Sequence, residues 1–314
     1  MSSGFRSMHP VVASLYYAGL LLFALLIFHP LFLVTEIAGL LVLLLLQGQG
    51  KLLLRSLPFM VLMAASVALL NPLFSHRGAH ILFYWLDQPI TLEAVLYGLM
   101  MMTVLLTVFL WFISYQYTVT TDKFMYLFAS AAPRTALLTL MTLRFVPLFR
   151  RRLQQITLIQ RLRGVDPRTG GLRKRMRDGM ILLKILLTWS LEEALQTGDS
   201  MTARGYGIAK RSNYSIYKAD FQDKLVLALL AASGAVTVLF WLQGAGRLEI
   251  YPRMKPLDFG WTEAVMYGSF CLFVLLPAAL EGKEKWLWRS SERSAYPSAI
   301  LKQTGTHFMS SRSQ

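Results

Sequence analysis

Long apolar stretches recur along this chain, and their lengths are those of membrane-spanning helices. A helix needs about 20 largely apolar residues to cross the hydrocarbon core of a bilayer. Six segments approach that length: Val11–Phe28, Leu31–Leu46, Leu52–Leu70, Leu92–Gln116, Leu225–Leu242 and Ala264–Leu280. The first two are short, and only His29 and Pro30 separate them, which suits a tight reversal because proline cannot continue a helix. They could form a re-entrant pair, but we favour two true spans and predict an all-α polytopic membrane protein with about six transmembrane helices.

A long segment without a span separates the fourth apolar stretch from the fifth. We therefore divide the chain into a membrane region with four spans, an insert, a membrane region with two spans, and a tail: residues 1–116, 117–222, 223–280 and 281–314. The length of the insert, about 100 residues, is its unusual feature.

The insert contains two amphipathic patterns with the period of an α-helix. The first places five apolar residues on one face: Phe145, Phe149, Leu153, Ile156 and Ile159. Pro147 is expected to kink this helix near its start. The second forms a similar stripe: Met176, Met180, Leu183, Leu187, Leu191 and Leu195. Turn-forming residues at 165–171 lie between the two patterns, so we predict two long helices joined by a loop.

Composition and charge support this picture and give it an orientation. Hydrophobic residues make up 55% of the 314 residues, and charged residues only 16%, against roughly 25% in soluble domains. The net charge is +15, and 117–222 alone holds 18 Lys and Arg against 7 Asp and Glu. The tail at 281–314 holds 6 basic and 3 acidic residues. Because Lys and Arg concentrate on the cytosolic side of membrane proteins, we predict that both termini, the Gln47–Lys51 turn and the insert are cytosolic.

Each amphipathic pattern leads into an Arg-Gly pair. The two motifs are Leu162-Arg163-Gly164 and Ala203-Arg204-Gly205, and their arginines stand 41 residues apart. Glycine after the last helical residue is a common helix stop, and arginine there complements the negative end of the helix dipole. Either motif alone is explained by that role. The pair is more informative, because two similar helix ends on one insert suit a partner with two similar sites, such as an ATPase dimer.

Lipid is a competing partner for the insert. Helices striped with Met and Leu, with arginines on their other faces, can lie at an anionic membrane surface. We expect both interactions: the apolar stripes pack under the membrane region or at the surface, and the helix ends project to a partner.

At these residues the sequence resembles the transmembrane T component of energy-coupling factor (ECF) transporters, relatives of ABC importers that take up vitamins and transition-metal ions. Ala203-Arg204-Gly205 matches the Ala-Arg-Gly signature of that family, and Leu162-Arg163-Gly164 keeps Arg-Gly with Leu in place of Ala. The other landmarks are similar to the loop between the third and fourth spans and to the segment entering the first coupling helix: Asn71-Pro72-Leu73-Phe74 with Gly78, Ile90-Thr91-Leu92-Glu93-Ala94 with Gly98, and Leu143-Arg144-Phe145-Val146-Pro147-Leu148. The resemblance runs from about residue 10 to residue 280.

The resemblance implies a scaffold in a bacterial plasma membrane rather than an enzyme. In that family the two helix ends sit in grooves on two cytosolic ABC-type ATPase subunits, and the coupling helices cradle a membrane-embedded substrate-binding S component. Arg163 and Arg204 would be the anchors, and Gly164 and Gly205 would allow close approach. Ala203 would permit near contact of the backbone. Leu162 implies either a roomier or more apolar groove, or a side chain that turns back onto the apolar stripe through Ile159.

Motifs for other chemistry are missing from the sequence. There is no Walker A motif and no HExxH, and a single cysteine, Cys271, excludes a multi-cysteine metal site. We expect no cofactor, no bound metal and no nucleic acid, since the basic run at 173–177 is typical of a solvated or lipid-facing patch. His76 and His80 could in principle bind a metal but are expected to be loop residues. Glu36, an acid inside an apolar segment, is expected near the membrane interface.

Two other functions compete with the scaffold. A membrane-embedded enzyme could hold the phosphate of a lipid or isoprenoid substrate with the basic insert, but it would need clustered carboxylates or histidines, and no such motif occurs. A secondary transporter is disfavoured because most such folds contain internal repeats, whereas these spans show no matching halves.

Overall fold

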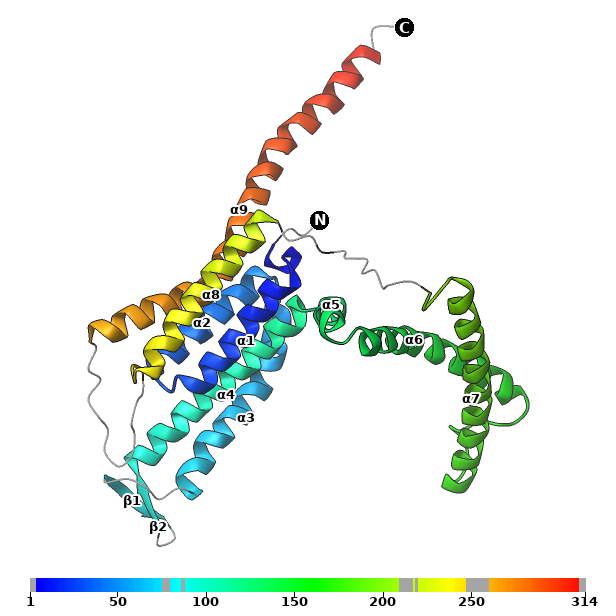
Figure 1. Cartoon of the computed structure of the whole chain (residues 1–314), viewed down its shortest axis with the longest axis horizontal. Coiled ribbons are helices and arrows are strands. Elements are labelled where there is room, and N and C mark those ends of the chain that lie inside the picture. The colour runs from blue at the N-terminus through cyan, green and yellow to red at the C-terminus, as the bar shows by residue number, and fades with distance from the viewer. Residues whose placement is uncertain are drawn as a thin grey trace. The chain divides into compact units, whose positions relative to one another are not determined.

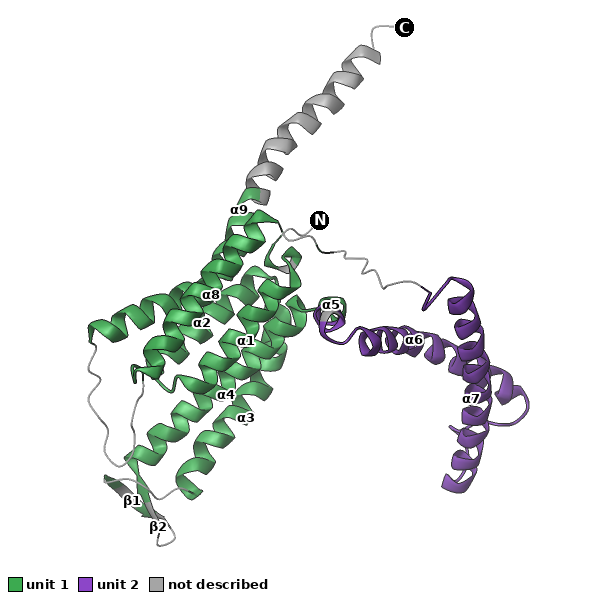
Figure 2. Cartoon of the chain, viewed as in Figure 1, with its two compact units in different colours: residues 1–123, 217–314 green, residues 124–216 purple. Residues whose placement is uncertain are grey.

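The chain folds into two compact units. The computed structural model describes residues 4–74, 80–85, 88–208, 217, 220–246 and 260–310, with side chains of the last helix described as far as Leu287. Unit 1 comprises residues 1–123 and 217–314, and unit 2 comprises residues 124–216 (Figure 2). Unit 2 is therefore inserted, in sequence, between two parts of unit 1.

Unit 1 is a helical bundle whose apolar helices occupy the six segments predicted from the sequence (Figure 1). These helices are α1 (Pro10–Leu26), α2 (Pro30–Leu46), α3 (Gly50–Phe74), α4 (Leu92–Thr118), α8 (Phe221–Leu242) and α9 (Trp261–Ser310). By length and composition, α3, α4, α8 and the first 27 residues of α9 can cross a membrane. The helices α1 and α2 have 17 residues each, the lower end of the range for a span.

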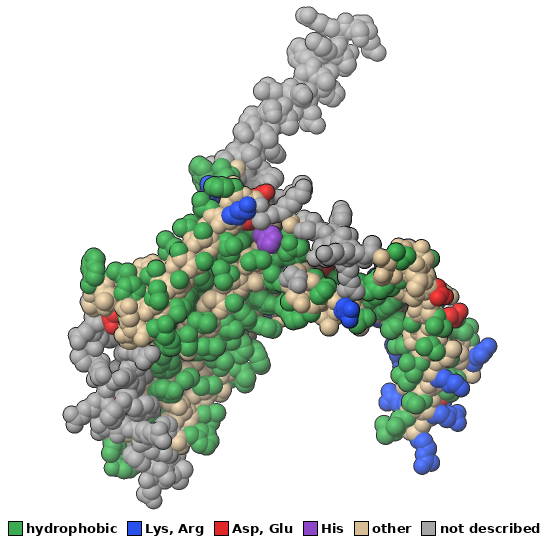
Figure 3. Space-filling model, viewed as in Figure 1, with side chains coloured by type: hydrophobic (Ala, Val, Ile, Leu, Met, Phe, Trp, Pro, Cys, Tyr) green, Lys and Arg blue, Asp and Glu red, His purple; other side chains and the backbone are tan. Residues whose placement is uncertain are grey.

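The core of the bundle is rich in aromatic side chains. Helix α4 packs along α3 and α2, and α9 packs along α8 and α2. Tyr16 and Tyr17 on α1 are fully buried, and Tyr16 stacks on Phe273 of α9. Many leucines on the outside remain exposed, among them Leu54 at 72%, and hydrophobic side chains cover much of the visible face of this unit (Figure 3). An apolar core beneath an apolar exterior is what a lipid-embedded bundle requires.

A buried acid lies inside the bundle. Glu36 was expected near the membrane interface, and it lies in the second turn of α2 with only 1% of its surface exposed. Its Oε1 has no hydrogen-bond partner among the described residues. The helix surface at this position therefore faces neighbouring helices rather than the surroundings of the bundle.

The loop between α3 and α4 contains a small hairpin that the apolar pattern did not predict. Strand β1 (Ile81–Trp85) pairs antiparallel with β2 (Gln88–Thr91). Asn71 at the end of α3 donates a hydrogen bond from Nδ2 to the carbonyl of Ala94 at 2.8 Å. Glu93 is buried, and its Oε1 lies 2.9 Å from Nδ1 of His80. The two loop segments singled out in the sequence thus meet, while His76 lies outside the described residues.

Unit 2 is built mainly from two long helices. These are α6 (Pro133–Leu162) and α7 (Leu172–Ala203), preceded by α5 (Thr121–Ala131), which begins in unit 1. The expectation that Pro147 stands near the start of its helix was wrong, because α6 begins 14 residues earlier and continues through it. Pro133 occupies the first turn of α6, where a missing N–H leaves no helical bond unmade.

Candidate functional site

The first Arg-Gly pair ends α6 with a complete Schellman motif. Arg163 is the C-cap, and Gly164 follows with φ of +76°. The N–H of Val165 donates to the carbonyl of Gln160 at 3.0 Å, and the N–H of Gly164 donates to Arg161 at 3.0 Å. Only glycine adopts a positive φ at little cost, so this geometry explains the glycine.

The second pair ends α7 in the same way. Arg204 is the C-cap, and Gly205 follows with φ of +81°. The N–H of Tyr206 donates to Met201 at 3.0 Å, and the N–H of Gly205 donates to Thr202 at 2.9 Å. Two helices with different sequences therefore present an arginine on the same backbone geometry.

Comparison with unit 1 separates the role of the glycine from that of the arginine. Helices α2 and α8 also end with a glycine of positive φ, Gly48 and Gly244, and with the same two backbone hydrogen bonds. Their C-cap residues are Gln47 and Gln243. An arginine is thus unnecessary for this helix stop, and its presence at both ends in unit 2 calls for another explanation.

Both arginines are free to bind a partner. Arg163 and Arg204 are exposed, and neither side chain has an ion pair or a hydrogen bond with another residue in the described part of the chain. The preceding residues, Leu162 and Ala203, are exposed too, Leu162 to 90%. A guanidinium offers several donors in a fixed fork, which suits bidentate pairing with a carboxylate.

The chain after Arg163 is held to both long helices. Arg161 Nε lies 3.3 Å from Asp166 Oδ2, and Asp166 Oδ1 accepts a hydrogen bond from the N–H of Arg168 at 3.0 Å. From α7, Arg175 Nε donates to the carbonyl of Pro167 at 3.2 Å. These bonds fix the loop that connects the first helix end to α7.

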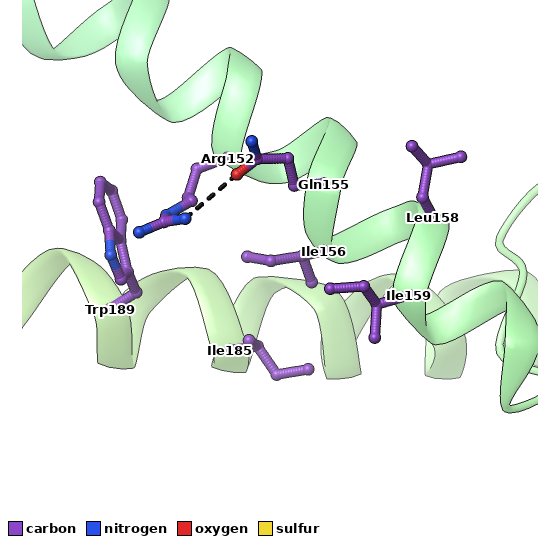
Figure 4. Close-up of a pocket in the computed structure, with 7 residues that line it drawn as sticks. All are labelled: Arg152, Gln155, Ile156, Leu158, Ile159, Ile185 and Trp189. Carbon is purple, nitrogen blue, oxygen red and sulfur yellow. Dashed lines mark hydrogen bonds between the residues drawn. The ribbon is translucent and has the colours of Figure 1, made fainter.

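An aromatic and cationic cluster fastens α6 to α7. Trp189 of α7 meets the ring of Phe149 edge-on, with centroids 5.7 Å apart, and the Arg152 guanidinium lies 4.7 Å from the Trp189 ring centroid. Arg152 also donates a hydrogen bond to Gln155 at 3.1 Å (Figure 4). Arg163 itself lines an adjoining hollow of about 570 Å³, together with Trp189 and Glu192. The first helix end therefore lies next to this crossing.

The two apolar stripes have different surroundings within unit 2. Phe149 and Ile156 of the first stripe lie at the crossing, and Figure 4 shows Ile156 directed toward Ile185 of α7. The second stripe, Met176 to Leu195, stays exposed, with 48–67% of each side chain's surface accessible. That this stripe packs against the membrane region or a membrane surface stays a prediction.

Residues 2–214 match the sequence model of the CbiQ family, described as a cobalt transport protein. The chain belongs to this family. The match covers α1 to α7 and therefore includes both Arg-Gly ends. It confirms the family resemblance and the multi-pass membrane fold predicted from the sequence.

Two similar proteins are named as transporter components, and a third is named as uncharacterized. The energy-coupling factor transporter transmembrane protein EcfT of Leuconostoc gelidum subsp. gasicomitatum is 36% identical over 114 residues, 35% of this CbiQ-family chain and 42% of the relative. EcfT of Lactobacillus helveticus is 29% identical over 184 residues, which are 54% of this chain and 65% of the relative. The uncharacterized protein MG181 of Mycoplasma genitalium is 35% identical over 109 residues, which are 34% of this chain and 26% of the relative. The chain thus spans from about a quarter to two thirds of the length of these relatives.

Sequence reasoning missed part of this site. Neither Arg152 nor Trp189 was singled out from the sequence, yet they form a cation–π contact between the helices. A tryptophan on a mostly aliphatic helix was the available signal. Among the described residues, no group of three or more His, Cys, Asp or Glu side chains could hold a metal ion.

Proposed function

We propose that this chain is the non-catalytic transmembrane scaffold of an ECF-type importer. Arg163 and Arg204 would each enter a groove on one of two cytosolic ABC-type ATPase subunits. Unit 2 would pass their ATP-driven motion to a membrane-embedded S component that captures a vitamin or a transition-metal ion. ATP hydrolysis would then belong to the partner subunits alone.

One observation carries this proposal: two exposed, unpaired arginines stand on matching helix ends within one unit. Membership of the CbiQ family and similarity to proteins named EcfT support the transport role. The basic character of 117–222 supports a cytosolic position for unit 2.

The test is co-purification of the two ATPase subunits with tagged chain from membranes. Arg163→Glu and Arg204→Glu should each weaken recovery, and the double variant should abolish it. Leaving a groove carboxylate unpaired costs about 2–5 kcal/mol in a desolvated site. Arg150→Glu is the matched control, because Arg150 is an exposed arginine of α6 away from both ends.

The variants should insert into the membrane in normal amounts, since both arginines lie outside the apolar helices of unit 1. Full ATPase recovery with the double variant would contradict the scaffold function.

A further inference from the structure

A hollow between α6 and α7 takes no part in the proposed function. It has a volume of about 380 Å³, within the range of small-molecule sites. Four apolar and four polar residues line it: Met141, Phe145, Pro147, Leu148, Arg144, Arg151, Glu193 and Thr197. On α6 it lies near the middle of the helix, and on α7 it lies about two turns before Arg204.

The charged groups of the hollow are arranged on opposite walls. Arg144 and Arg151 are seven residues apart on α6, which is about two helical turns, so they lie on one face. Glu193 and Thr197 are four residues apart on α7 and are therefore neighbours. The hollow thus has two guanidinium groups on one helix and a carboxylate on the other.

These charges have no partner among the described residues. Arg144, Arg151 and Glu193 form no ion pair or side-chain hydrogen bond with any other residue that the structure describes. Glu193 is only half-buried, whereas both arginines are exposed. Two free guanidiniums suit a phosphate, which accepts their N–H groups in a fork, and a nearby free carboxylate suits an ammonium.

We propose that this hollow binds the headgroup of phosphatidylethanolamine. The phosphate would lie against Arg144 and Arg151, and the primary ammonium would donate hydrogen bonds to Glu193. The assignment rests on the hollow and its charges, so it is independent of the ATPase contacts at the two helix ends.

The apolar surroundings favour a lipid over a free phosphate. Next to the hollow, the first half of α6 exposes four apolar side chains, each 41–64% accessible: Leu138, Leu140, Leu143 and Val146. Acyl chains would cover such a surface, whereas inorganic phosphate would leave it in water. The chain is also a multi-pass membrane protein, so phospholipid is at hand.

The ammonium contact gives the proposal a sharp test. Phosphatidylcholine has the same charges, but its quaternary ammonium has no N–H to donate. Full-length protein, purified in detergent and delipidated, would be titrated by native mass spectrometry with phosphatidylethanolamine, phosphatidylcholine and phosphatidylglycerol. Wild type should prefer phosphatidylethanolamine by about tenfold or more, the contribution of a charged hydrogen bond.

Three variants separate the two halves of the site. Glu193→Gln keeps the side-chain shape. It should bring the ratio of the affinities for phosphatidylethanolamine and phosphatidylcholine close to one. Arg144→Gln with Arg151→Gln should reduce binding of all three lipids by tenfold or more. Arg150→Gln should bind as wild type does, because Arg150 does not line the hollow. Matching circular dichroism and elution would show that each variant is folded.

Other outcomes would overturn the proposal. Equal binding of phosphatidylethanolamine and phosphatidylcholine by wild type would show that Glu193 does not recognise the primary ammonium. Displacement of lipid by millimolar inorganic phosphate would identify a plain phosphate site. Unchanged lipid binding in the double arginine variant, with loss of a co-purifying protein, would assign the hollow to a protein partner instead.

Discussion

At each end of the long helices of unit 2, arginine and glycine have separable roles. The glycine closes the helix with a positive φ, as Gly48 and Gly244 do elsewhere in the chain. The arginine contributes nothing visible to that closure, because glutamine precedes the glycine at those two other ends. The residue before the arginine then becomes informative, since it is leucine at one end and alanine at the other.

The exposure of Leu162 decides between two explanations of its size. At 90% exposure it does not turn back onto the apolar stripe of its own helix, so under the proposed function a roomier or more apolar groove on the partner would have to accommodate it. We therefore expect Ala203→Leu to clash with a fitted groove and to weaken ATPase affinity by roughly tenfold to a hundredfold, or about 1–3 kcal/mol.

Leu162→Ala should have a milder effect on ATPase affinity, and neither change should alter folding of the exposed helix ends. Binding titrations of each single variant with purified ATPase subunits measure both effects. Wild-type affinity for both variants would mean that only arginine and glycine are recognised.

At the scale of elements, the crossing of α6 and α7 determines where the helix ends point. Phe149, Arg152 and Trp189 form an aromatic and cationic contact at the crossing, and much of the apolar stripe of α7 stays exposed. Motion of one helix is transmitted to the other through contacts of this kind.

Trp189→Ala should therefore loosen the contact between the helices without removing either helix end. The ring contact and the cation–π contact are each worth about 0.5–1.5 kcal/mol, so we expect faster amide hydrogen exchange in 149–160 and 181–192. ATPase subunits should still co-purify, while transport driven by ATP should fall. Trp189→Phe keeps an aromatic ring, so its exchange rates and its transport should lie between those of wild type and of Trp189→Ala. Unchanged exchange in Trp189→Ala would show that the crossing is held by other contacts.

The sequence predicted the spans, the two helix ends and the loop between them, because each depends on local patterns of apolar residues, glycine and proline. It placed the start of α6 too late, because the helix was read from the apolar stripe that begins at Phe145; Thr135, Thr139 and Thr142, at helical steps of four and three, were the missed signal. The β1–β2 hairpin is too short to leave a reliable alternation. The contact of Arg152 with Trp189 depends on the register of one helix against another, which the period of a single helix does not contain.

At the scale of the whole molecule, the two units differ in chemistry. Unit 1 has apolar surface around an aromatic core, and much of the net positive charge lies in the segment that contains unit 2. This asymmetry predicts that unit 2 faces the cytosol.

Limited proteolysis tests this topology. Trypsin should cut inside-out vesicles at 168–175, where exposed arginines and a lysine follow the first helix end. Right-side-out vesicles should be protected at the same sites until detergent is added. Cleavage in the opposite vesicles would reverse the orientation.

The shared helix stop has a consequence for how such Arg-Gly ends arise. Glutamine and arginine codons can differ by a single nucleotide, so Gln-Gly at the end of a helix is one mutational step from Arg-Gly. Because the backbone bonds at Gly48, Gly164, Gly205 and Gly244 are alike, such a step leaves the fold unchanged and alters only the charge that is presented. New contacts with a partner can therefore evolve on this scaffold without a cost in folding.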